Sequence, residues 1–284
     1  MQTQTYTIET DDYQMLMDCI ERSNKYIMQS MLLNRNQKTF NIIENFILQM
    51  SNYHLSKIKI PDKCETYIEF WYKDNVTSNG NFIHAFHFDK DEKIFQKHKK
   101  IICPNLSTIT YLNDSIYPTL ITNITHNVDN NDSMLLSFPK KLKHISFCGD
   151  RLHCAINALD KNVQEHKMNK IESRKTLMFN IWINHKPEGV NEFITLDKEH
   201  SENRSLFIIK ELKDLKNIYT NPFLINLLTY DIILMRKDCK RIFSEYIDFK
   251  TLECKSNILF TSIREHLILD AAGSDTGLPL LYIG

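Results

Sequence analysis

The feature that most constrains the fold is a series of eight short apolar runs between residues 66 and 183. Each run is rich in Ile, Tyr, Phe and Thr and is bounded by Asn, Asp, Pro or Gly, which is typical of β-strands. Eight short strands with no strong helix among them predict a jelly-roll sandwich or barrel, in which two sheets face each other across a core. The runs are TYIEFWYK, NFIHAFHF, LSTITYLN, PTLITNIT, SMLLSF, LKHISFC, RLHCAI and RKTLMFNIWI.

Helices are expected on both sides of this β region. Apolar residues recur at helical spacing from about residue 11 to residue 50, which predicts two amphipathic helices separated near NRNQK. The runs PFLINLLTYDIILM and CKRIFSEYIDF predict further helices, and the polar segment DKNVQEHKMNKIES predicts an inserted surface loop. We therefore expect one domain of the mainly β class with flanking helices (α+β). Its parts would be N-terminal helices (1–55), the β core (56–190) and a largely helical C-terminal extension packed on the core (191–284).

Composition narrows the classes of partner. The 284 residues include 35 basic and 35 acidic side chains, so no overall field favours a nucleic acid or an anionic membrane. Seven scattered cysteines without a C-x-x-C pair predict free thiols in a reducing compartment. No apolar run approaches the roughly 20 residues that cross a bilayer, and the N-terminus lacks signal-peptide features. We expect a cytoplasmic protein with no membrane partner, whose oligomeric state the sequence does not predict.

The first candidate site lies in HAFHFDKDEK. His87 and Asp89 are two residues apart, so on a strand both side chains would point to one face and could reach one metal ion. Such pairs also arise by chance at solvated strand ends. Strand parity places His84 on the face opposite to His87, as a packed or rim residue, and Asp91 and Glu92 would form a solvated turn or part of a substrate entrance.

Two further residues, His153 and Arg174, strengthen the interpretation of His87 and Asp89 as part of a site. His153 lies in the apolar run FCGDRLHCAI, where a lone histidine is more often a hydrogen-bonded core residue than a ligand. Arg174 begins the last apolar run. A guanidinium that enters a barrel needs an anion to offset its desolvation, and a carboxylate held by two hydrogen bonds is the usual partner.

Taken in this order, the residues resemble the Fe(II)- and 2-oxoglutarate-dependent oxygenase superfamily. Its double-stranded β-helix carries a facial triad of two histidines and one carboxylate. LSTITYLND, YPTLI and SFPKKLKHISFCGDRLH resemble the family's third-strand segment, the turn that follows it and the approach to the distal histidine. The resemblance covers roughly residues 68–182. It departs from the family in lacking the glycines of the turn, and Arg174 lies 21 residues after His153, further than in many members.

The resemblance implies a site and a reaction. His87, Asp89 and His153 would bind Fe(II), and Arg174 would bind the far carboxylate of the co-substrate 2-oxoglutarate, with Lys161 as the alternative. The hydroxyls of Thr176 and Tyr111 are further candidate donors to the co-substrate, and O2 would be the oxidant. Asp89 favours hydroxylation, because halogenating members lack this carboxylate. The substrate class stays open among a protein side chain, a small molecule and a nucleobase, and the neutral net charge weighs modestly against the nucleobase.

Two other functions stay open from the sequence. One is a jelly-roll binding module without turnover, which would be expected to lack a ligand or the anion partner. The other is a cupin-type metal enzyme that does not use 2-oxoglutarate, in which several histidines are usually spread over two strand motifs.

Overall fold

The structure is a computed structural model of the 284-residue chain. It describes residues 3–37, 40–61, 63–76, 82–115, 117–125, 133–156, 173–193, 205–212, 232–235, 247–248 and 253–254.

All eight runs that the sequence analysis identified form strands. They are β3 (Thr66–Val76), β4 (Phe82–His87), β5 (Leu106–Tyr111), β6 (Thr119–Thr125), β7 (Ser133–Ser137), β8 (Lys143–Phe147), β9 (Arg151–Ile156) and β10 (Ser173–Ile183).

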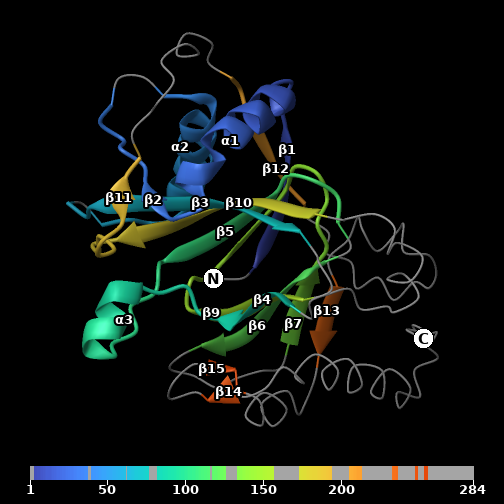
Figure 1. The fold of residues 1–284 in the computed structure, drawn as a ribbon. Coiled ribbons are helices and arrows are strands. Elements are labelled where there is room, and N and C mark those ends of the chain that lie inside the picture. The colour runs from blue at the N-terminus through green and yellow to red at the C-terminus, as the bar shows by residue number, and fades with distance from the viewer. Residues whose placement is uncertain are drawn as a thin grey trace, which may run out of the picture.

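The strands form two facing antiparallel sheets (Figure 1). One contains the order β3-β10-β5-β8 and the other the order β7-β6-β9-β4, so strands that follow one another in the chain mostly alternate between the sheets. This is the arrangement of a double-stranded β-helix, or jelly roll. The predicted fold class, mainly β with flanking helices, is confirmed.

Short strands from outside the predicted core extend both sheets. The larger sheet runs β11-β2-β3-β10-β5-β8-β1-β12 and the smaller one gains β13 beside β7. The added strands are β1 (Gln4–Glu9), β2 (Met31–Leu32), β11 (Asn191–Glu192), β12 (Ile208–Glu211) and β13 (Ile232–Met235). The N-terminal segment therefore contributes strands as well as the two expected helices, and the domain boundaries stay a prediction.

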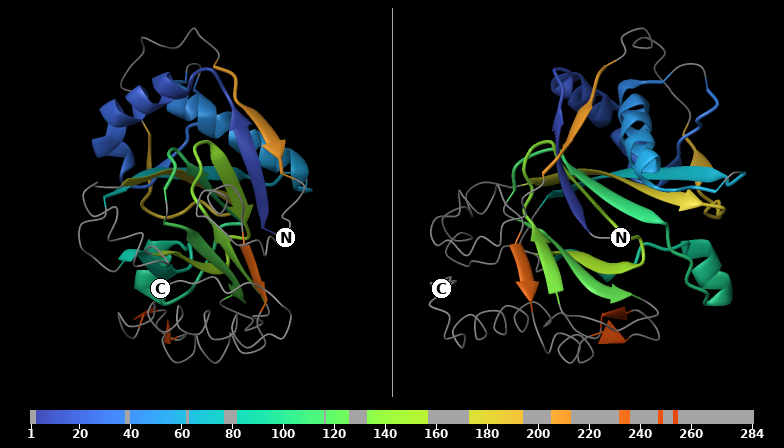
Figure 2. Two further views of the ribbon diagram at one scale, coloured as in Figure 1. Left: turned by 90° about the vertical axis from the view of Figure 1, so that its right-hand side faces the viewer. Right: turned by 180° about the vertical axis from the view of Figure 1, so that it is seen from behind.

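The two N-terminal helices, α1 (Tyr13–Ile27) and α2 (Ile42–Lys57), confirm the helical periodicity. Both pack on the face of the larger sheet that points away from the smaller sheet (Figure 2). Helix α2 begins with a capping box, in which Asn41 and Glu44 each accept a hydrogen bond from the other's backbone N–H. The apolar faces of the helices and the outward side chains of β3 and β10, such as Phe70 and Phe179, form one buried core.

The third helix, α3 (Glu92–His98), was not predicted. Asp91 is its N-cap and accepts a hydrogen bond from the backbone N–H of Ile94. The Asp91 side chain is buried and also accepts from His185 Nε2 at 2.9 Å and from the backbone N–H of Glu188 at 2.8 Å. The solvated-turn interpretation is therefore wrong for Asp91, although Glu92 is exposed and pairs with Lys90.

The prediction of C-terminal helices is wrong for the residues of these segments that the structure describes. Residues 232–235 form β13, and β14 (Ile247–Asp248) pairs with β15 (Glu253–Cys254). A run rich in isoleucine suits a strand as well as a helix, and β7 offers an edge with which it can pair. The rest of both segments, and the expected surface loop apart from Ser173, lie outside the described residues.

The space between the two sheets contains a second, smaller core. It comprises Ile109, Tyr111, Ile121, Leu135, Ile145, Phe147 and Met178. Within the described part of the chain, no helix is long and apolar enough to cross a membrane.

Candidate metal centre

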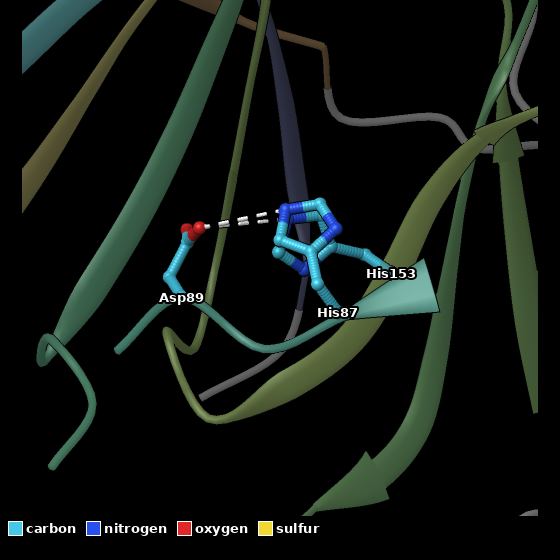
Figure 3. Close-up of side chains that lie close together, drawn as sticks. All are labelled: His87, Asp89 and His153. Carbon is cyan, nitrogen blue, oxygen red and sulfur yellow. Dashed lines mark ion pairs between the residues drawn. The ribbon is translucent and has the colours of Figure 1, made fainter. Parts of the chain in front are cut away.

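Strands β4 and β9 bring the two histidines together. His87 and His153 are direct cross-strand partners, so their side chains project from the same face of the smaller sheet. Their ring centroids lie 4.3 Å apart. Strand β4 ends at His87, and two residues later the chain places Asp89 opposite both rings (Figure 3).

The turn before β9 depends on a glycine. A Cβ atom on Gly149 would lie 2.3 Å from the carbonyl oxygen of Pro104, so only glycine lets the chain pass this close. The turn leads into Arg151, the first residue of β9, and so helps to place His153 two residues later.

The three side chains form a group that can hold one metal ion. Asp89 Oδ1 lies 3.8 Å from His87 Nε2 and 3.8 Å from His153 Nε2, and the ligand atoms all lie within 4.8 Å of one another. Two nitrogen or oxygen ligands that share an ion, at about 2.1 Å each, are at most about 4.2 Å apart. The donor set therefore fits a divalent ion with little movement, and the described residues contain no second such group.

Hydrogen bonds orient two of the three candidate ligands. His153 Nδ1 lies 2.9 Å from the carbonyl oxygen of Arg151, which can only accept, so Nδ1 carries the hydrogen and Nε2 keeps its lone pair. Ser107 donates to Asp89 Oδ2 at 2.6 Å, which leaves Oδ1 facing both histidines. Burial lowers the pKa of His153 to about 4, so the ring is neutral at pH 7 and can bind a metal.

Arg174 lines the same cavity as the three candidate ligands. Its residue surface is only 3% exposed. Its Nε donates to the carbonyl oxygen of Tyr117 at 3.1 Å, and one Nη donates to Thr119 Oγ1 at 2.6 Å. Among the described residues no carboxylate pairs with Arg174, and burial lowers its pKa from the ordinary value. The cavity thus contains a buried cation whose charge no described side chain offsets.

The candidate ligands and Arg174 enter the cavity from different parts of the fold. Asp89 is bonded to Ser107, which pairs with Asn180 on β10, six residues along the strand from Arg174. The other side chains that line the cavity are mainly apolar and include Trp71, Ile109, Phe147 and Met178.

The hydroxyls of the other predicted co-substrate residues have hydrogen-bond partners within the protein. Thr176 is fully buried, and its hydroxyl donates to the sulfur of Met178 at 3.9 Å. The Tyr111 hydroxyl lies 2.8 Å from Thr119 Oγ1 and 3.1 Å from the carbonyl oxygen of Ser137. Neither Thr176 nor Tyr111 is among the lining residues, and Lys161 lies outside the described residues.

His84 is placed differently from the prediction. Its ring stacks on that of His87, with centroids 4.2 Å apart and an interplanar angle of 17°, and it lines the cavity. The expectation that it faces the opposite side is wrong, because β4 has two register shifts, one on each side of His84. Such irregularities break the two-residue alternation on which the prediction relied.

Sequence reasoning missed two residues of the site. Ser107 orients Asp89, and Thr119 binds Arg174. Both lie in strands that were identified, but their role depends on which strands pair and in what register, which no local pattern reveals.

No protein-family model matches the chain, and no curated protein matches it. Several solved structures are similar. A prolyl-4-hydroxylase from Pseudomonas putida is 11% identical, with 62% of this chain and 91% of that chain covered and a TM-score of 0.37. HygX from Streptomyces hygroscopicus, with nickel and 2-oxoglutarate bound, is 8% identical, with 66% and 84% covered and a TM-score of 0.39. EctD from S. alaskensis, in its apoform, is 12% identical, with 67% and 78% covered and a TM-score of 0.34.

Proposed function

We propose that the protein is an Fe(II)- and 2-oxoglutarate-dependent dioxygenase that hydroxylates a protein side chain or a small molecule. In this proposal His87, Asp89 and His153 hold the iron, and Arg174 binds the far carboxylate of 2-oxoglutarate. A cytoplasmic location is part of the proposal and rests on the scattered cysteines in the sequence.

The observation that carries the proposal is the joint lining of one cavity by the three candidate ligands and by a buried arginine. A facial set of two histidines and one carboxylate suits Fe(II) and leaves the opposite coordination positions open. The uncompensated guanidinium in the same cavity calls for an anion of matching planar geometry. A dicarboxylate that reaches from the metal to Arg174 meets both requirements.

The overall reaction would convert substrate–H, 2-oxoglutarate and O2 into substrate–OH, succinate and CO2. Bound iron would supply the activation of O2 that this oxidation requires. The chain's own part is to hold the ligands and exclude water. Ser107 and the Arg151 carbonyl fix the orientation of two ligands, Arg174 anchors the co-substrate, and the apolar side chains of the lining keep the cavity dry.

Conversion of 2-oxoglutarate to succinate tests the proposal, first without a substrate and then with pools of peptides or metabolites. The wild-type protein with Fe(II) should form succinate, and Arg174→Ala should lose this turnover. Lys175→Ala is the matched control, because Lys175 is the next residue on β10 and pairs with Glu21 and Asp74 near the surface.

The outcomes separate the alternatives. A cupin-type metal enzyme would bind iron through the same residues, yet Arg174→Ala would leave its activity intact. A binding module would form no succinate under any condition. The absence of succinate from a folded, iron-loaded protein would contradict the proposal.

A further inference from the structure

His87 is the most exposed of the three candidate ligands. Its side chain is 28% exposed, against 11% for that of Asp89 and 7% for that of His153. Packing against the protein therefore restricts the ring of His87 less than it restricts the other two ligands. Two neighbouring rings contact it. The ring of His153 lies with its centroid 4.3 Å away at an interplanar angle of 54°, and the ring of His84 lies 4.2 Å away at 17°.

An irregular strand brings His84 to this position. In β4, His84 pairs with Ala155 and His87 pairs with His153, with one register shift before His84 and another after it. Regular alternation would put two side chains three positions apart on opposite sides of the sheet, and such an irregularity can turn one of them to the other side. Ala155 presents only a methyl group beside the imidazole of His84, and both residues line the cavity. The strand therefore departs from regular geometry at the point where a second ring covers His87.

A stacked ring favours the metal-bound form of His87. The face of an aromatic ring is electron-rich and attracts positive charge at close range. A divalent ion draws electron density from an imidazole that binds it, so the His87 ring becomes more positive and its attraction to the face of His84 increases. A nearly parallel stack also opposes rotation of the His87 ring about its side-chain bonds. The ring therefore keeps its Nε2 directed toward Asp89 Oδ1, which lies 3.8 Å away.

We propose that His84 is a positioning residue of the metal centre, which holds the ring of His87 by stacking and does not itself bind the ion. Among the described residues, the group of side chains that can share one ion contains His87, Asp89 and His153 but not His84. Hydrogen bonds orient Asp89 and His153, so with this stack each of the three candidate ligands has a contact that orients it. This inference rests on the proposed function, because it assumes that these three residues bind the metal.

Two substitutions separate the flat ring of His84 from its nitrogen atoms. His84→Phe keeps a flat ring and removes both nitrogens, whereas His84→Leu removes the flat ring and keeps an apolar side chain. His98→Leu is the matched control, because His98 is exposed at the end of α3. The measurement is titration of the metal-free protein with Co(II) at pH 8, where an ordinary histidine is neutral. Co(II) is used in place of Fe(II) because it takes the same nitrogen and oxygen ligands and its visible bands depend on their positions.

The affinity for Co(II) and the visible bands should change together. The wild type, His84→Phe and His98→Leu should bind Co(II) with equal affinity and give the same bands. The free energy of an aromatic pair predicts that His84→Leu binds Co(II) about 2- to 12-fold more weakly. Its bands at saturation should also shift, because the ring of His87 is no longer held in one orientation. A loss of packing alone would lower the stability of the protein without moving these bands.

The two proposals fail in different ways. If the folded wild-type protein binds neither Co(II) nor Fe(II), the metal centre is wrong and His84 has no ligand to position, so both proposals fail. If the wild type binds Co(II) and His84→Leu binds it equally well, or more weakly but with unchanged bands, His84 has no positioning role while the proposed function stands. If His84→Phe is weakened as much as His84→Leu, the centre depends on a nitrogen of His84 rather than on its flat ring, and the stacking proposal is wrong.

Discussion

The hydrogen bond from Ser107 to Asp89 gives a sharp test of the metal centre. Ser107 Oγ donates to Asp89 Oδ2 at 2.6 Å, and this bond turns the other carboxylate oxygen toward both histidines. The Ser107→Ala variant keeps all three proposed ligands but lets the carboxylate rotate. Loss of a partner that orients a metal ligand typically costs 10- to 100-fold in metal affinity, which corresponds to about 1.4–2.7 kcal/mol.

The assay is an anaerobic calorimetric titration, in which Fe(II) is added to the metal-free protein and the heat of binding gives the affinity. Ser146→Ala is the matched control, because Ser146 is equally buried but its hydroxyl contacts Tyr6 on the other side of the larger sheet. We expect Ser107→Ala to bind Fe(II) about 10- to 100-fold more weakly and Ser146→Ala to bind it as the wild type does. Equal affinity of Ser107→Ala and the wild type would refute the role of Asp89 as a ligand held by Ser107.

Three predictions concern stability. Burial lowers the pKa of His54 to about 4 and that of His144 well below its ordinary value, and the Nε2 atoms of the two rings lie 2.9 Å apart. At a pH between about 4 and 6.5 the folded protein therefore keeps both rings neutral, whereas the same histidines in the unfolded chain gain protons. The free energy of unfolding should therefore fall as the pH drops from about 6.5 toward 4. Urea denaturation at several pH values should show that this free energy falls less steeply in His54→Gln than in the wild type. The same dependence of the free energy on pH in both proteins would contradict the prediction. Asp91→Ala should lower the free energy of unfolding, measured by urea denaturation, by about 1–3 kcal/mol, because the cap of α3 and two further hydrogen bonds disappear. Substitution of the exposed neighbour, Glu92→Ala, should change this free energy little. Equal losses in the two variants would count against the buried cap. Phe179→Ala should cost about 3–5 kcal/mol in the same assay because Phe179 is fully buried between α2 and the larger sheet, and a loss below about 1 kcal/mol would contradict this packing.

The regular strands and the amphipathic helices could be predicted because their signals are local. Eight runs with strand composition became eight strands, and the apolar spacing of residues 11–50 became α1 and α2. The added strands were missed because β2 and β11 contain two residues each, and β1 is a strand because β8 and β12 pair with it. Pairing of this kind is set by tertiary contacts rather than by local sequence.

The candidate site likewise combines features that can be read from the local sequence with features that depend on strand pairing. The spacing of His87 and Asp89 and the order of His153 and Arg174 can be read along the chain, and the structure brings these four residues to one cavity. The position of His84 could not be read, because the register shifts of β4 override alternation.

Hydroxyl partners were equally hidden from the sequence. Thr119 and Thr176 are both strand threonines near Arg174, and only the pairing of β6 with β7 and β9 shows which of them lines the cavity.

The central claim is that one cavity binds a metal through His87, Asp89 and His153 and an anion through Arg174. Anaerobic addition of 2-oxoglutarate to the Fe(II)-loaded protein tests it most directly, because the visible metal-to-ligand band requires both to be bound together. In the wild type, the account predicts an absorption band that saturates as 2-oxoglutarate is added. The band should be absent in Asp89→Ala, and in Arg174→Ala it should saturate only at a far higher concentration of 2-oxoglutarate. A folded wild-type protein that gives no band, or an Arg174→Ala variant that saturates like the wild type, would contradict it.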